Sequence, residues 1–120
     1  MRTSVRVVLT LGLLCLPRLV HAQNPVNPTQ IEFDHADYAT TDNYEVGYFT
    51  SATAAAPLQS GTLAKPTTCN PCSGTLPSRP TAFGSYWIAV RAIAGTFQSP
   101  WSNYVPFDRR PVAPTARRAF

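Results

Sequence analysis

The sequence has 120 residues, and its 10 basic and 6 acidic residues give a formal net charge of +4 at pH 7. This length allows one ordinary domain and is too short for two. Residues 23–108 hold three basic and six acidic residues, a net charge of −3. A nucleic-acid-binding domain has a basic face on its folded part, so we expect no nucleic-acid partner.

Residues 1–22 have the three parts of a secretory signal peptide. A basic start is followed by an apolar run of 11 residues from 7 to 17, and Val20-His21-Ala22 fits a cleavage site. We expect cleavage between Ala22 and Gln23, which leaves 98 residues and places the protein outside the cell, in a periplasm or on the cell surface. A retained signal anchor is the alternative. The apolar run is shorter than the about 20 residues that span a membrane, so we expect no membrane span after cleavage.

The next part of the chain predicts short strands. Residues 23–30 contain two prolines and no alternation, which is typical of a linker or a degenerate first strand. Residues 31–34 alternate between apolar and acidic side chains and fit a strand. Two weaker strands are expected within residues 58–66 and 74–78. Residues 44–49 alternate clearly, with one face formed by Tyr44, Val46 and Tyr48.

The strongest alternation lies in residues 86–92. One face of this predicted strand holds Tyr86, Ile88, Val90 and Ala92, and the other holds Trp87, Ala89 and Arg91. Gly95 marks a turn, and an extended run resumes over residues 101–107. Residues 109–120 have no pattern and predict a disordered basic tail. Since no window shows helical spacing, the short strands predict an all-β sandwich or barrel.

The stretch from Tyr86 to Ala92, then Gly95 and Ser99-Pro100-Trp101-Ser102, resembles the end of a fibronectin type III domain. The family's penultimate strand typically reads Tyr-x-Val-x-Val-x-Ala and is followed by such a glycine and a Ser-Pro-Trp-Ser motif. Residues 44–48 resemble the family's third strand and residues 31–33 its second. The resemblance implies an immunoglobulin-like antiparallel β-sandwich of six or seven strands over residues 31–108.

The first strand and Tyr86 lead to further expectations. Tyr86 can return its buried hydroxyl to a nearby backbone group. The family places a leucine six residues earlier, where this chain has a proline, so Phe83 or Leu76 takes that role. The family's first strand is short or missing here. The edge of residues 31–34 is then either open to a strand from a partner chain or blunted by nearby prolines.

Two cysteines, Cys69 and Cys72, remain after the predicted signal. Because an exported chain meets oxidising conditions, we expect a structural disulfide between them. A redox-active pair and free thiols are alternatives. A zinc site needs four ligands, and His35 is the only histidine after residue 22. The turn geometry also predicts a cis bond between Asn70 and Pro71.

No arrangement of residues indicates catalysis or a cofactor. Four carboxylates fall within 12 residues, but they miss the spacing of a calcium loop and indicate a solvated acidic stretch: Asp34, Asp37, Asp42 and Glu45. A Ser-His-Asp set has only His35 available, and no glycine-rich phosphate loop is present. We therefore expect no catalytic residue, no metal and no cofactor.

The outward residues Trp87, Arg91, Trp101 and Tyr104 form the candidate surface, and Phe97 is a possible extension. Arg91 is expected to stack on an indole. The group is either a surface ladder that stiffens the sheet or a patch that binds a protein or a glycan. The resemblance implies a non-catalytic binding or adhesion module, and we expect a monomer. The alternative is a structural or accessory subunit that completes its sheet with a partner chain.

Overall fold

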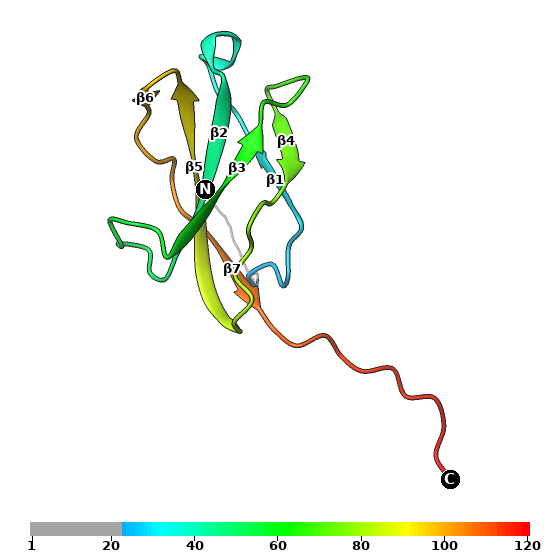
Figure 1. Ribbon diagram of the computed structural model, residues 1–120. Helices are drawn as coiled ribbons and strands as arrows, with labels where there is room; N and C mark the ends of the chain where they lie inside the picture. Colours follow the sequence, from blue (N-terminus) through cyan, green and yellow to red (C-terminus); the bar gives the residue numbers. More distant parts are fainter. Residues whose placement is uncertain (1–22) are drawn as a thin grey trace, which may run out of the picture.

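The computed structural model describes residues 23–120, and the predicted signal peptide of residues 1–22 lies outside the described residues. The described chain forms two antiparallel sheets that face each other, so the all-β sandwich prediction is confirmed (Figure 1). Seven strands and one 3-10 helix make up the fold: β1 (Gln30–Phe33), η1 (Tyr38–Thr40), β2 (Asn43–Phe49), β3 (Gln59–Ala64), β4 (Cys72–Thr75), β5 (Gly84–Ala94), β6 (Phe97–Gln98) and β7 (Val105–Arg109).

The larger sheet has five strands in the order β3-β2-β5-β6, and β7 also pairs with β5. β5 is the longest strand, with β7 beside its first half and β6 beside its end. The smaller sheet contains only β1 and β4. Of the two weaker predicted strands, β3 spans residues 59–64, within the expected 58–66, whereas β4 spans residues 72–75 and begins before the expected 74–78.

The core lies between the two sheets and is built by the alternating faces of β2 and β5. The predicted inward residues of both strands are buried or packed against the core: Tyr44, Val46, Tyr48, Tyr86, Ile88, Val90 and Ala92. Phe107 from β7 stacks on Tyr86, with ring centroids 5.5 Å apart. Burial raises the pKa of Tyr48 to about 12, because its charged form would lose contact with water.

Tyr86 holds the turn that precedes β5. Its hydroxyl donates to the carbonyl oxygen of Ala82 over 2.9 Å, which confirms the predicted return to the backbone. Leu76 is 4% exposed and joins the core, whereas Phe83 is 61% exposed. Of the two residues that the sequence offered in place of a leucine, Leu76 is therefore the one that packs in the core.

The N-terminal segment pairs with the last strand and not with β1. Val26 forms a parallel bridge with Asp108. The Asn27 N–H donates to the Asp108 carbonyl over 2.8 Å, and the Asp108 N–H donates to the Pro25 carbonyl over 2.9 Å. The predicted degenerate first strand is thus a single bridge near the C-terminal end of β7. It leaves the outer edge of β1 without a paired strand in residues 23–120.

The last strand differs from the predicted extended run over residues 101–107. The chain forms β6 and β7 as two short strands, with residues 99–104 between them. Arg109 belongs to β7 and not to the tail, since its guanidinium donates to the Pro80 carbonyl over 3.0 Å and to Asn27 Oδ1 over 2.9 Å. From Arg110 onward the chain has no secondary structure and runs away from the body (Figure 1).

Candidate functional site

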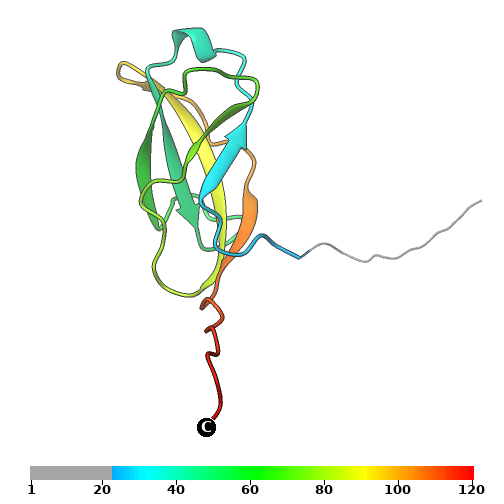
Figure 2. The same ribbon diagram turned by 90° about the vertical axis from the view of Figure 1, so that its right-hand side faces the viewer.

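A groove with a volume of about 490 Å³ opens beside β1. Residues of β1, β5 and β7 line it, and Figure 2 shows the ribbons of β1 and β7 in front of β5. We call it the β1 groove. Its lining residues come from the N-terminal segment, β1, β5, β7 and the approach to β7, and include Pro25, Ile31, Phe33, Ile88, Val90 and Phe107.

The floor of the β1 groove is apolar because it is part of the core. Ile88 and Val90 are only 6% and 7% exposed, and they pack in one cluster with Phe107. Ile31 and Phe33 form the opposite wall and are partly buried against the same cluster. No strand within residues 23–120 covers this side of the sandwich, so core side chains line the groove directly.

The rim of the β1 groove is the backbone edge of β1. Thr29 accepts a hydrogen bond from the Leu76 N–H over 2.9 Å, and bonded and non-bonded pairs alternate along an antiparallel ladder. Ile31 and Phe33 therefore bond to β4, whereas the backbone groups of Gln30 and Glu32 point outward. Among residues 23–120, no strand or bridge pairs with this outward edge.

The groove continues past the end of β1. A second hollow of about 200 Å³ shares Phe33, Asp34, Val90 and Ser102 with the first and reaches His35. There the imidazole Nδ1 of His35 lies 2.9 Å from the Tyr44 hydroxyl. The charged residues that line the β1 groove itself are both acidic, Glu32 and Asp34. An incoming segment would therefore meet an apolar floor and a negatively charged rim.

Two serines of the Ser-Pro-Trp-Ser motif bond to β5 in the gap between β6 and β7, where no strand of the described residues pairs with that edge of β5. The Ser102 N–H donates to the Val90 carbonyl over 2.9 Å, and the Ser102 hydroxyl accepts from the Val90 N–H over 3.0 Å. Ser99 makes the same pair of bonds with Ala92, over 2.9 and 2.8 Å. Each serine side chain thus takes the place of a strand carbonyl, and the two residues between them bulge away from β5.

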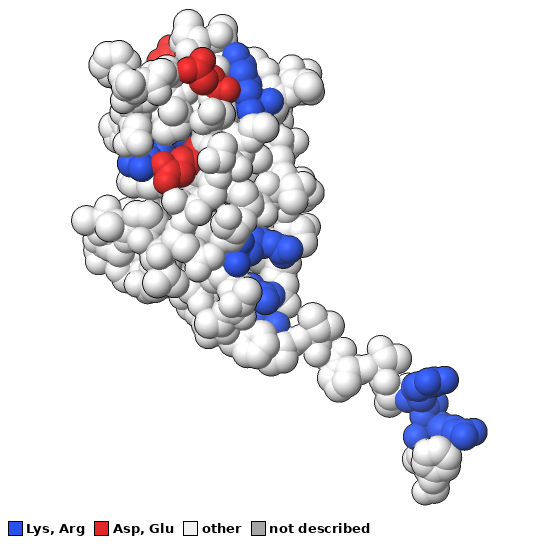
Figure 3. All heavy atoms as spheres, in the orientation of Figure 1, with Lys and Arg blue, Asp and Glu red and all other residues white. Residues whose placement is uncertain are grey.

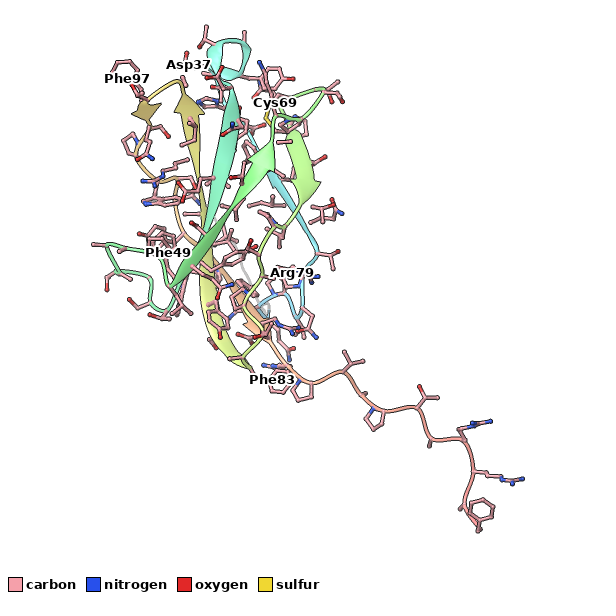
Figure 4. All side chains as sticks on the ribbon, viewed as in Figure 1. Asp37, Phe49, Cys69, Arg79, Phe83 and Phe97 are labelled. Carbon is pink, nitrogen blue, oxygen red and sulfur yellow. A yellow bond between two sulfur atoms is a disulfide. The ribbon has the colours of Figure 1, made fainter. Side chains whose placement is uncertain are left out.

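The bulge places Trp101 on the outer face of the larger sheet. A Cβ atom at position 47 would lie 2.8 Å from Trp101 Cη2, so the indole sits in a slot that glycine leaves. The Trp101 ring meets Phe49 edge-on at 5.3 Å, and Phe49 stacks on Tyr104 at 4.3 Å. Phe49, which points away from the core, is fully buried by these rings near the loop after β2 (Figure 4).

Phe49, Arg91, Trp101 and Tyr104 form a cluster on this outer face, which we call the outer cluster. Arg91 is held in it by an ion pair and by stacking. Its guanidinium lies 4.3 Å from the Trp101 ring centroid, as the sequence predicted for an indole. It also forms an ion pair of 2.7 Å with Glu45, which accepts a further hydrogen bond from Ser60. Burial acts to raise the pKa of Glu45, but the bonds from Ser60 and Arg91 outweigh it and hold that pKa below its ordinary value.

The four predicted surface residues share the outer face of the larger sheet. Arg91, Trp101 and Tyr104 belong to the outer cluster, and Trp87 lies directly opposite Phe49 in the β2–β5 register, although it makes no stacking or cation–π contact within the part of the chain that the structure describes. Phe97 lies opposite Ala94, whose side chain shares the inward face of β5, so it does not extend the cluster. It projects at the hairpin tip (Figure 4) and is 78% exposed.

The sequence analysis did not identify Gly47 or Phe49 as part of the outer cluster, nor Glu45 as the partner of Arg91. A glycine inside a strand often marks the close approach of another group, and this signal was present at position 47. Glu45 lies directly opposite Arg91 in the β2–β5 register. The two residues are 46 positions apart in the chain, so the ion pair could not be predicted from either strand alone.

The two cysteines form a bridge, and two of the four carboxylates, Asp42 and Glu45, bind other parts of the fold. Cys69 and Cys72 form the predicted disulfide, and the Asn70–Pro71 bond is cis as predicted. Asp42 accepts a hydrogen bond of 2.7 Å from the Gly95 N–H and so holds the β5–β6 turn. Within residues 23–120, no three His, Cys, Asp or Glu side chains come together as a metal site.

Comparison of the chain with protein-family models, with curated proteins and with solved structures finds no match. The described residues contain no helix with the length and apolar character needed to cross a membrane. The β1 groove and its unpaired edge are therefore the features from which a function can be inferred.

Proposed function

We propose that this chain is an exported, non-catalytic binding module of the fibronectin type III kind. Its ligand is an extended segment of a protein, which adds a strand to the open edge of β1. The observation that carries this proposal is the unpaired edge of β1 beside an apolar groove of about 490 Å³.

The strand arrangement supports the family assignment. In immunoglobulin-like sandwiches the second strand lies in one sheet, while the third and the penultimate strands are neighbours in the other. The resemblance makes β1 the second strand, β2 the third and β5 the penultimate one. β1 lies in the smaller sheet and β2 pairs with β5 in the larger one, as this assignment requires.

The chemistry of the edge favours an extended ligand. A strand that pairs with β1 would bond to the outward backbone groups of Gln30 and Glu32 and would place alternate side chains against Ile31 and Phe33. Backbone bonds of this kind supply affinity, and the pockets for alternate side chains supply specificity. Pairing would also cover Ile31 and Phe33, which are only partly buried against the core.

The outer cluster is less suited to a ligand. Arg91 is already bound to Glu45 and Trp101, and the Tyr104 hydroxyl donates to the Ala54 carbonyl over 2.6 Å. Because these groups satisfy one another, they are better explained as a surface ladder that stiffens the sheet than as a patch for a protein or a glycan.

The proposal is tested with a proline at position 30. The Gln30 N–H points away from β4, so Gln30→Pro removes a donor to an added strand without removing a β4 bond. Gln30→Ala is the matched control, because it shortens the side chain and keeps the donor. Peptides are selected on the wild-type chain from a displayed library of decapeptides, and their binding to the three chains is measured.

We expect selected peptides to bind the wild-type and Gln30→Ala chains and to lose binding to Gln30→Pro. NMR should show the largest shifts at the amides of Gln30 and Glu32. Peptides that bind Gln30→Pro equally well, or that shift resonances around Trp101 and not β1, would contradict the proposal.

A further inference from the structure

We propose that the segment bound in the β1 groove is residues 112–117 from the tail of a second copy of this chain. This inference rests on the proposed function, since it names the partner for the same edge. It differs from the sequence-based expectation of a monomer.

Charge favours the tail as the partner. The charged residues that line the β1 groove are Glu32 and Asp34, and both are acidic. The tail carries Arg117 and Arg118 and has no acidic residue after Asp108. Basic side chains gather near the end of the tail, apart from the body (Figure 3).

The order of residues in the tail matches the two sides of the groove. In an antiparallel pair with Thr115 opposite Glu32, Arg117 lies opposite Gln30 and diagonal to Glu32, within reach of its carboxylate. Side chains alternate along a strand, so Val112, Pro114 and Ala116 then point into the apolar groove. The side chains that point into the groove are thus all apolar, and the charged Arg117 is among those that point outward.

The prolines of the tail are compatible with this register. Bonds to β1 come from residues opposite Gln30 and Glu32, which are Arg117 and Thr115, and both have an N–H. Pro114 directly precedes Thr115 and lies opposite Phe33 in this register, so its backbone nitrogen faces away from β1. A proline in this position belongs to an edge strand without loss of a ladder bond.

The path of the tail favours a second copy over the same molecule. The tail leaves β7 at Arg110, whose carbonyl accepts a hydrogen bond of 3.0 Å from the Asn27 side chain. Residues 25–27 already pair with the C-terminal end of β7 beside Arg110, and the tail leads away from the body (Figure 1). A tail that binds the groove of another copy makes a head-to-tail contact, which extends into chains unless it closes into a ring.

The proposal is tested by sedimentation of the full chain over a wide range of concentration, together with three variants. One lacks residues 111–120, which contribute nothing to the core cluster. The second is Val112→Lys, which puts a charge into the apolar groove. The third is Ala113→Lys, a matched control whose new charge lies on the outward side near Asp34. We expect the wild-type chain and Ala113→Lys to associate with rising concentration, and the other two to stay monomeric.

A charge-reversal cycle tests the register. A labelled synthetic peptide of residues 111–120 is titrated with the chain that lacks its own tail. Glu32→Lys in the chain, or Arg117→Glu in the peptide, should each weaken binding about tenfold, and the two together should restore part of it.

The outcomes separate this proposal from the proposed function. A wild-type chain that stays monomeric while the peptide binds the tailless chain would show a tail that folds into its own groove, and would overturn the second-copy proposal. If the peptide does not bind but library peptides still bind at β1, the tail is not the ligand and the proposed function stands. If neither binds at β1, both proposals fail.

Discussion

Trp101 lies so close to the backbone of Gly47 that a Cβ atom at position 47 would be 2.8 Å from the indole Cη2. The same atom would lie 3.0 Å from a ring carbon of Phe49. Gly47→Ala must therefore displace Trp101 and loosen its stack with Arg91. We expect a loss of about 1–3 kcal/mol in the free energy of unfolding, measured by urea denaturation.

The control for this substitution removes the indole first. In a Trp101→Ala background the main obstacle to the new methyl group is gone, so Gly47→Ala should cost clearly less there. An equal cost in both backgrounds would mean that the methyl group acts through the backbone or Phe49 alone, and that the slot for Trp101 has no energetic importance.

The period-2 pattern of residues 86–92 was sufficient to predict much of the fold. It identified the inward face of β5, as the alternation of residues 44–49 did for β2, and the position of Tyr86 predicted its bond to the backbone. These features depend on short stretches of chain, where alternation and burial are directly coupled.

The site was harder to predict, because it depends on contacts between distant segments. The sequence left the edge of residues 31–34 either open or blunted by prolines. It could not show that residues 25–27 pair with Asp108, which lies more than 80 residues away. That pairing takes the N-terminal segment to β7 and leaves the β1 groove uncovered.

The serines of the Ser-Pro-Trp-Ser motif should matter through the strand groups that they satisfy. Ser102→Ala leaves the Val90 N–H, in a buried residue, without its hydroxyl acceptor. We expect a loss of about 1–3 kcal/mol in unfolding free energy and faster hydrogen exchange at the Val90 amide. Ser73→Ala, at an exposed serine of β4, is the control and should have little effect. An unchanged Val90 exchange rate would argue against the replacement of a strand carbonyl by the serine hydroxyl.

The disulfide should make a small contribution to stability, because it closes a loop of only four residues. The double substitution of Cys69 and Cys72 by serine is expected to lower the unfolding free energy by about 2 kcal/mol while the chain stays folded. Thermal denaturation of the two chains measures the difference. A double variant that is unfolded at room temperature would show that the bridge holds the fold and not one loop.

The Glu45 carboxylate should make stability depend on acid. Its pKa is lower in the folded chain than its ordinary value of 4.5, so the folded state favours the charged form. This contribution is fully present above about pH 4.5 and is lost as the pH falls through the lowered pKa. Glu45→Gln should reduce the loss of unfolding free energy that occurs as the pH falls below about 4.5. An identical pH profile for both chains would contradict a role for the Arg91–Glu45 pair.

Hydrogen exchange along β1 in the chain that lacks residues 111–120 tests most directly whether the edge is open. The amides of Ile31 and Phe33 bond to β4 and should exchange slowly, whereas those of Gln30 and Glu32 point outward and should exchange rapidly. Slow exchange at all four amides in that monomeric chain would mean that the edge is covered by the chain itself, and would contradict the proposed binding site.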